Sequence, residues 1–190
     1  MTTERFDTSQ LSGRNRRLLN EWKQLEQHLT GRSDLSWRVS KTNPLGLPTG
    51  YRVDYHIRSI CGVSQADRLG QPGVENRPLF ADHFVLQIAL PANFPQVDAP
   101  PIFQFLTADE QGQPIPHPWH PNISFFGSFG GRVCLNRADT FTSIAWGVSR
   151  VAAYLRYEVF HALMEPPYPE DLKVAEWVRT QGEPNGWTVF

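Results

Sequence analysis

Residues 120–135 read HPNISFFGSFGGRVCL, and this stretch holds the side chains most able to carry out chemistry. It opens with His120-Pro121-Asn122, and Cys134 lies near its end. Because prolines and glycines interrupt the whole region 107–136, we expect it to be irregular and to lie at the surface. A thiolate can attack a carbonyl carbon, and a side-chain amide can stabilise the oxyanion that forms. The stretch is therefore compatible with acyl transfer through a thioester on Cys134, and from the residues alone Cys134 can also be a packing residue.

Regular periods of apolar residues precede this stretch. Leucines and a tryptophan at spacings of four, three and four predict an amphipathic helix over residues 12–30, with Ser12 as its cap. Apolar and polar residues then alternate, which predicts half-buried strands at 51–58 and 84–90, and a short apolar run predicts another strand at 102–106. The order predicts a helix followed by an antiparallel meander, with proline-rich loops at 64–79 and 91–101.

Two helices are predicted after the stretch. Apolar residues recur at helical spacing from Ile144 to Ala162, which predicts the longest helix of the chain, ended by Pro166 and Pro167. Residues 171–180 are predicted to form a short final helix. A helix, a meander and further helices in this order predict the α+β class.

Length and composition predict one ordered domain in a reducing compartment. The chain has 190 residues, 40% of them hydrophobic, which excludes a wholly disordered chain. Its two cysteines cannot form a disulfide framework. The first residues show no signal peptide and no apolar run is long enough to span a bilayer, so we expect a cytoplasmic protein with no membrane partner. A net charge of −1 argues against nucleic acid as a partner.

A cluster of positive charge lies in the predicted N-terminal helix. Its members are Arg14, Arg16, Arg17 and Lys23, with Glu21 as the only acidic residue among them. Such a cluster is often a solvated helix face, and it can also be a docking surface for an acidic partner. Both interpretations stay open from the residues alone.

The motifs and the order of elements resemble those of ubiquitin-conjugating (E2) enzymes. His120-Pro121-Asn122 is similar to the HPN motif of that family, and residues 131–135 are similar to its G-x-[IV]-C-L nucleophile segment. Three further stretches also match: Phe94-Pro95 with Pro100-Pro101, Trp146, and residues 166–172. The resemblance implies a UBC-like fold with an N-terminal helix, a four-stranded antiparallel meander, a central helix and a short C-terminal helix. It places a single domain at 12–180, between a flexible N-terminus at 1–11 and a C-terminal tail at 181–190.

The resemblance also implies roles for individual residues. Cys134 would accept a ubiquitin-like modifier as a thioester from an E1-like enzyme, and Asn122 would stabilise the oxyanion when a lysine of a protein target attacks. Asp171 would orient that lysine and help it lose its proton, and His120 and Pro121 would shape the active site. The basic cluster of the first helix would dock the E1-like enzyme. No cofactor or metal is implied, because ATP would be used by the E1-like partner and His117 and His120 lack further ligands.

Some positions depart from the family pattern. Extra residues lie around 126–130 and between Cys134 and Trp146, and Gly147-Val148-Ser149 stands where the family has S-P-A. The position that often presents an apolar residue to RING-type ligases is Gln96, so such ligases are not expected partners. The reduced chain resembles bacterial E2-like proteins of ubiquitin-like conjugation operons, some of them linked to defence against phage.

Two other functions are compatible with parts of the pattern. One is a binding module on the same fold, similar to E2 variants that bind ubiquitin-like proteins without catalysis. The other is a Cys-His-Asn hydrolase, which needs a histidine paired to Cys134. Asp171 can also be an ordinary helix cap, and Cys61, which has no motif around it, is predicted to be a packing residue.

Overall fold

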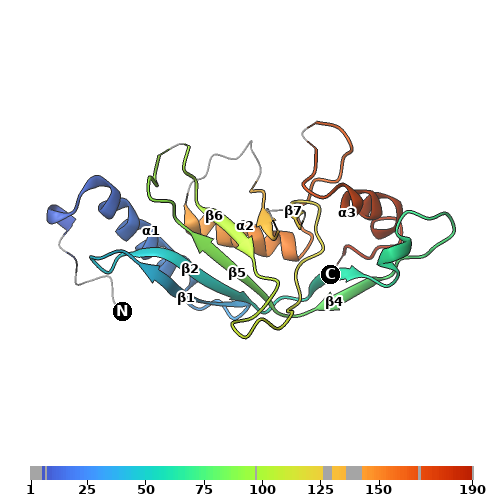
Figure 1. Cartoon of the computed structure of the whole chain (residues 1–190), viewed down its shortest axis with the longest axis horizontal. Coiled ribbons are helices and arrows are strands. Elements are labelled where there is room, and N and C mark those ends of the chain that lie inside the picture. Colours follow the sequence, from blue (N-terminus) through green and yellow to red (C-terminus); the bar gives the residue numbers. More distant parts are fainter. Residues whose placement is uncertain are drawn as a thin grey trace.

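A sheet with helices packed against one of its faces makes up most of the structure (Figure 1). The computed structural model describes residues 6, 8–96, 98–125, 130–135, 143–166 and 168–189. Helix α1 spans Gly13–Leu29, α2 spans Ile144–Leu155 and α3 spans Leu172–Trp177. The combination confirms the predicted α+β class.

Helix α1 forms as the spacing of its leucines predicts. The Ser12 side chain caps it by accepting a hydrogen bond from the backbone N–H of Asn15, and its apolar stripe, with Trp22, is buried against the sheet and α2. The cap satisfies one of the backbone donors that a helix leaves open at its start.

The main sheet is antiparallel and has the strand order β1-β2-β5-β6-β8-β7. Its strands are β1 (Leu35–Thr42), β2 (Pro48–Tyr55), β5 (Phe84–Ala89), β6 (Ile102–Phe105), β7 (Ile123–Ser124) and β8 (Arg132–Val133). The first four strands are the predicted four-stranded meander, which β8 and β7 extend. The expectation of an irregular, surface-lying region 107–136 is therefore wrong for the two short strands and for the buried residues 120–124.

A second hairpin, β3 (Ser59–Val63) with β4 (Pro78–Ala81), continues β2 and β5 beyond a break. The predicted strand 51–58 is therefore too long at its end, because β2 stops at Tyr55. At the break the rings of His56 and His83 stack with their centroids 5.3 Å apart. The predicted loop 64–79 is two residues too long, because β4 already begins at Pro78, and the loop includes a short 3-10 helix at Ala66–Arg68.

Helix α2 is shorter than predicted. It ends at Leu155, so Val159 and Ala162 lie outside it, and α1 is the longer helix. The chain leaves the helix at Tyr157, whose φ of 53° is not helical. Tyr157 is buried there, and its hydroxyl donates to the carbonyl oxygen of Trp119.

The predicted final helix is present in two parts. Asp171 caps α3, and a π-helical turn at Val178–Gly182 follows it directly. These residues form a second core with β3 and Tyr157, apart from the main core between the sheet and helices α1 and α2.

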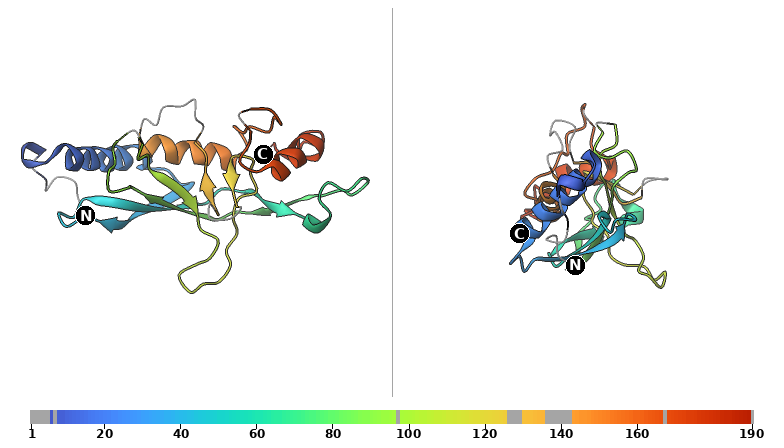
Figure 2. Two further views of the ribbon diagram at one scale, coloured as in Figure 1. Left: turned by 45° about the horizontal axis from the view of Figure 1, so that its top comes forward. Right: turned by 90° about the vertical axis from the view of Figure 1, so that its left-hand side faces the viewer.

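Figure 2 shows α1 and α2 on one side of the main sheet, while the loop after β6 projects from the other side. The division into segments 1–11, 12–180 and 181–190 stays a prediction. Both flanking segments nevertheless contribute to the packed body, since Phe6 contacts Trp22 and Trp187 stacks on Trp177. Within the described residues, none of the helices is long and apolar enough to cross a membrane.

Candidate active site

The hairpin of β7 and β8 brings the backbones of Asn122 and Cys134 side by side. Ile123 pairs with Val133, and the ladder continues with a hydrogen bond of 2.9 Å from the Cys134 backbone N–H to the Asn122 carbonyl oxygen. Side chains at directly opposite positions have Cβ atoms about 5 Å apart. The Cys134 thiol is half-buried and the Asn122 side chain is buried. The two residues that the motif selects are therefore neighbours in the structure.

Gly131 allows this hairpin to lie against β6. Its backbone N–H donates to the Ser124 carbonyl oxygen at 2.6 Å, and its own carbonyl oxygen accepts from the Phe105 N–H at 2.8 Å. Its φ is +82°, and a Cβ at this position would lie 2.2 Å from the carbonyl oxygen of Phe105. A side chain here would collide with backbone, so glycine is required for the strand that leads into Cys134.

The amide of Asn122 is held in one orientation. Its Oδ1 accepts a hydrogen bond of 3.0 Å from the backbone N–H of His161, in the segment after α2. The Nδ2 end of the amide is its donor end. Asn122 thus orders the loop before β7 by joining it to the segment after α2.

His120 is buried and makes structural contacts with its neighbours. Its Nδ1 accepts from the backbone N–H of Asn122 at 3.1 Å, and its ring stacks on Tyr154 and meets Tyr157 edge-on, each with centroids 4.9 Å apart. Burial lowers the pKa of His120 to about 3, so the imidazole is neutral at physiological pH. These contacts support the structural role that the motif implies and speak against a Cys-His-Asn hydrolase.

Tyr154 contacts Cys134, although no motif in the sequence includes it. Its hydroxyl donates to the carbonyl oxygen of Cys134 at 3.0 Å, and its ring is the one that stacks on His120. The Cys134 backbone is therefore held from two sides, by Asn122 and by α2. A tyrosine in the apolar stripe of a helix normally indicates core packing, so the sequence carried no signal for this contact.

Asp171 lies beside the HPN loop. Its backbone N–H donates to the carbonyl oxygen of Pro121 at 3.0 Å, which gives Pro121 a part in joining the two segments. Its Oδ1 accepts from the N–H groups of Lys173 and Val174, as an N-cap does. Burial raises the pKa of the Asp171 carboxyl group, and the bonds to the cap only partly offset this effect. Asp171 is thus a helix cap, and its predicted catalytic role stays a prediction.

Three of the four basic residues proposed for docking make contacts within the chain, among them Arg16, whose guanidinium donates to the carbonyl oxygen of Leu11 at 3.3 Å. The guanidinium of Arg17 pairs with Glu21 at 2.6 Å, and that of Arg14 donates to the carbonyl oxygen of Pro91 at 3.4 Å. Arg16 is exposed and Lys23 is half-buried. Docking of an E1-like enzyme at these residues stays a prediction, with Arg16 the most accessible of the four.

Glu21, counted in the sequence as a surface charge, is buried, with 1% of its side chain exposed. Its Oε2 accepts from the backbone N–H of Ile144, the first residue of α2, at 2.7 Å. A carboxylate at a helix N-terminus satisfies an open donor and interacts favourably with the helix dipole. Glu21 therefore fixes the start of the helix that carries Tyr154.

Other candidate residues stand apart from the site. Cys61 is half-buried on β3, and burial raises the pKa of its thiol, which makes it a poorer nucleophile. His117 contacts Phe125, with ring centroids 4.2 Å apart, and burial lowers its pKa. Among the described residues no group of three or more His, Cys, Asp or Glu side chains is placed to hold a metal ion.

The unusual insertions are only partly described. Residues 126–129, 136–142 and Pro167 lie outside the described residues, so the expected extra residues around 126–130 and before Trp146 are not placed. Gly147, the first residue of the Gly147-Val148-Ser149 stretch, is described: a Cβ there would lie 2.4 Å from the ring of Phe103. The glycine thus lets α2 pack closely against β6.

Comparison with solved structures identifies the fold. No family model and no curated protein matches the sequence. The structure is similar to that of the ubiquitin conjugating enzyme Pex4p of H. polymorpha, solved in complex with the soluble domain of Pex22p, with a TM-score of 0.52 and 15% identity over 93% of this chain and 92% of that chain. A ubiquitin conjugating enzyme E2 from Plasmodium falciparum matches with a TM-score of 0.44 and 17% identity over 73% of this chain and 95% of that chain. The chain has the fold of ubiquitin-conjugating enzymes.

Proposed function

We propose that this chain is an E2-type carrier, which accepts a ubiquitin-like protein as a thioester on Cys134 and transfers it to an amine of a target protein. The observation that carries the proposal is the pairing of Cys134 with Asn122 across the β7–β8 hairpin, with the amide oxygen of Asn122 held by His161. The fold, shared with Pex4p, supports it.

Loading would be an exchange of one thioester for another. The Cys134 thiolate attacks the carbonyl carbon that joins the C-terminus of the modifier to a cysteine of the E1-like enzyme. A carbon–sulfur bond to Cys134 forms and the bond to the E1-like cysteine breaks, so no electrons are gained or lost. The half-buried position of Cys134 leaves its thiol within reach of a partner.

Discharge would form an amide bond. The amine attacks the same carbonyl carbon, the Nδ2 group of Asn122 donates to the oxyanion, and the carbon–sulfur bond to Cys134 then breaks. The proton lost by the amine passes to the departing thiolate or first to a nearby base. Asp171 is the proposed base: its two described cap bonds use Oδ1, and a raised pKa makes the carboxylate a better proton acceptor.

The partners follow from this chemistry. They are a ubiquitin-like modifier, an E1-like enzyme that uses ATP, and a protein that supplies a lysine. We propose that the E1-like enzyme docks on α1, where Arg16 is exposed. We also propose a bacterial conjugation operon and phage defence as the setting, which genes for an E1-like ATPase and a β-grasp modifier beside this one would support.

Asn122 permits a test that separates loading from discharge. In Asn122→Asp the side chain keeps an oxygen to accept from His161 but loses the Nδ2 donor. We expect this variant to fold and load normally and to discharge to free lysine about 100- to 1000-fold more slowly, the usual cost of removing an oxyanion donor. Equal slowing of loading and discharge would contradict an oxyanion role for Asn122.

The alternative, a binding module without catalysis, gives a different result. A binding module would retain the modifier without a covalent bond, and Cys134→Ser would leave that retention unchanged. The decisive reaction contains the cognate E1-like enzyme, the modifier and ATP. If no thioester forms in it while the chain still binds the modifier, the chain is a binding module and not a carrier.

A further inference from the structure

A row of hydrogen-bond donors crosses the face of the sheet that the helices leave open. The row consists of Arg38 on β1, Arg52 on β2, Gln87 on β5, Gln104 on β6 and Arg132 on β8, each directly opposite the next. Directly opposite residues of an antiparallel sheet point to the same face. The flanking rows, such as Val53 with Leu86, are buried beneath the helices, so the donor row points away from them.

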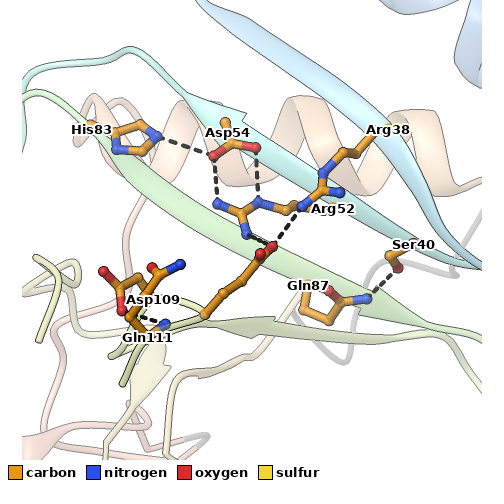
Figure 3. Close-up of polar contacts among 9 residues, drawn as sticks. Arg38, Ser40, Arg52, Asp54, His83, Gln87, Asp109 and Gln111 are labelled. Atoms are coloured by element: carbon orange, nitrogen blue, oxygen red, sulfur yellow. Dashed lines mark hydrogen bonds and ion pairs between the residues drawn. The ribbon is translucent and has the colours of Figure 1, made fainter. Parts of the chain in front are cut away.

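The first two members of the row place like charges side by side. Arg38 and Arg52 are a directly opposite pair, an arrangement that is unfavourable without a counter-charge. The carboxylate of Asp54 holds the Nε and Nη2 groups of Arg52 at 3.1 and 3.2 Å (Figure 3). This contact fixes the guanidinium and leaves its Nη1 group to donate to Glu110.

A carboxylate already occupies the space between the two arginines. One oxygen of Glu110, Oε1, accepts from Arg38 at 3.0 Å and from Arg52 at 3.4 Å. The two strands therefore build a site for a carboxylate, and the chain fills it with its own. The Glu110 side chain is 68% exposed and that of Arg38 is 60% exposed, so this ion pair is held weakly against water.

Glu110 comes from the loop that projects from this face of the sheet. A bridge between Ala108 and Pro114 closes the loop, and the carboxylate of Asp109 accepts from the backbone N–H groups of Gln111 and Gln113. Asp109 is therefore engaged within its own turn. Glu110 reaches the arginines from outside the sheet, in the way that a segment of another protein would.

The rest of the row has the same chemical character. Gln87 donates to Ser40 at 2.7 Å and Gln104 donates to the carbonyl oxygen of Gly130 at 2.7 Å, so both amides take part as donors. The row contains three guanidinium groups and no carboxylate. Five strands spaced about 4.8 Å apart give it a length of roughly 19 Å, which matches about six residues of an extended chain.

We propose that this row binds an extended acidic segment of a partner protein, whose carboxylates displace Glu110 from Arg38 and Arg52 and follow the row toward Arg132. The Glu110 carboxylate, which lies between the two arginines, indicates the charge and the geometry that a ligand needs at this position. None of the five members of the row is aromatic, which disfavours single-stranded nucleic acid, because its bases stack on aromatic rings. Arg132 lies two residues before Cys134, so a bound segment would run toward the nucleophile. The site is independent of the thioester chemistry.

The test measures binding of a fluorescein-labelled hexaglutamate peptide to the whole chain, with hexaglutamine as the uncharged control. Fluorescence anisotropy reports the binding at low and at moderate salt. Arg38→Gln should weaken binding of hexaglutamate at least fivefold, and Glu110→Gln, which removes the internal competitor, should strengthen it about two- to fivefold. Arg68→Gln is the matched control, since it removes one exposed positive charge from the turn between β3 and β4 and should change little.

Four results would overturn the proposal. Hexaglutamate could fail to bind better than hexaglutamine, or Arg38→Gln and Arg68→Gln could weaken binding equally, which would indicate a general charge effect. Glu110→Gln could bind no more tightly than the unaltered chain. Finally, a labelled uridine hexamer could bind more tightly than hexaglutamate and lose that affinity in Arg38→Gln, which would make the row a surface for nucleic acid.

Discussion

Replacing Gly131 with alanine should separate β8 from β6 and move the segment that carries Cys134. Gly131 has a φ of +82°, which an alanine adopts at a cost of about 1–2 kcal/mol. The added Cβ would lie 2.2 Å from the carbonyl oxygen of Phe105, so one of the two strands must shift. The shift would break the two backbone hydrogen bonds that Gly131 makes to Ser124 and Phe105, at about 1 kcal/mol each. The expected loss of stability is about 3–4 kcal/mol.

Gly112 provides a matched control for the conformational part of this cost. Its φ is +77°, and no atom lies within 4 Å of where a Cβ would stand. Gly112→Ala should therefore lose only about 1–2 kcal/mol. The two variants should therefore differ by about 2 kcal/mol in their loss of unfolding free energy, and this difference measures the contact of β8 with β6.

Urea unfolding followed by tryptophan fluorescence gives the free energies of unfolding for both variants. In a Cys61→Ser background, the rate of alkylation by iodoacetamide then reports the exposure of Cys134 alone. We expect Gly131→Ala to be alkylated faster than the parent and Gly112→Ala to be alkylated at the parental rate. Equal losses of stability in the two variants would refute the close approach of β8 to β6.

Three further variants test individual contacts. Asp34→Asn should lower the free energy of unfolding by about 1 kcal/mol at pH 7. Because the hydrogen bond from Arg32 lowers the pKa of Asp34, this loss should shrink as the pH falls below about 4. A difference in urea midpoints that does not change with pH would contradict this. Glu21→Ala should lower the free energy of unfolding by about 2–3 kcal/mol, because the first N–H of α2 stays buried without its acceptor. Glu21→Gln keeps an acceptor and should lower it by about 1 kcal/mol. Equal losses in the two variants, measured by urea unfolding, would argue against this hydrogen bond. Tyr154→Phe keeps the ring but loses the hydrogen bond to Cys134, so its free energy of unfolding should fall by about 1 kcal/mol and its Cys134 should be alkylated faster. An unchanged alkylation rate would show that this hydrogen bond does not position the thiol.

The order of the elements could be predicted from the sequence, but not all of their limits. The resemblance implied a fourth strand, but the periodicity did not place β1 although Trp37 and Val39 alternate with polar residues, because the alternation is short and its last residues are all exposed. Helix α2 was extended too far because Val159 and Ala162 keep its apolar period. They pack against the two cores from outside the helix, and no glycine or proline marks the turn at Tyr157.

The pairing of Cys134 with Asn122 could be predicted from the motif, because both residues belong to it. The contacts that hold the pair could not. The donor to Asn122 is a backbone N–H of His161, and any residue type except proline could supply it. Glu21 resembles a surface residue in a basic helix, and only the fold brings it to the start of α2. Such contacts depend on which elements pack together and leave no local pattern.

The central claim is that Cys134 forms a thioester with a ubiquitin-like protein, and intact mass spectrometry of a charging reaction tests it most directly. The reaction contains this chain, its cognate E1-like enzyme, the modifier and ATP. We expect one modifier to be attached, removable by a thiol reductant, absent from a reaction without ATP and retained in Cys61→Ser. In Cys134→Ser the attachment should become a reductant-resistant ester. The central claim is contradicted if no modifier is attached. It is also contradicted if Cys134→Ser still carries the modifier as a thioester while Cys61→Ser no longer carries it.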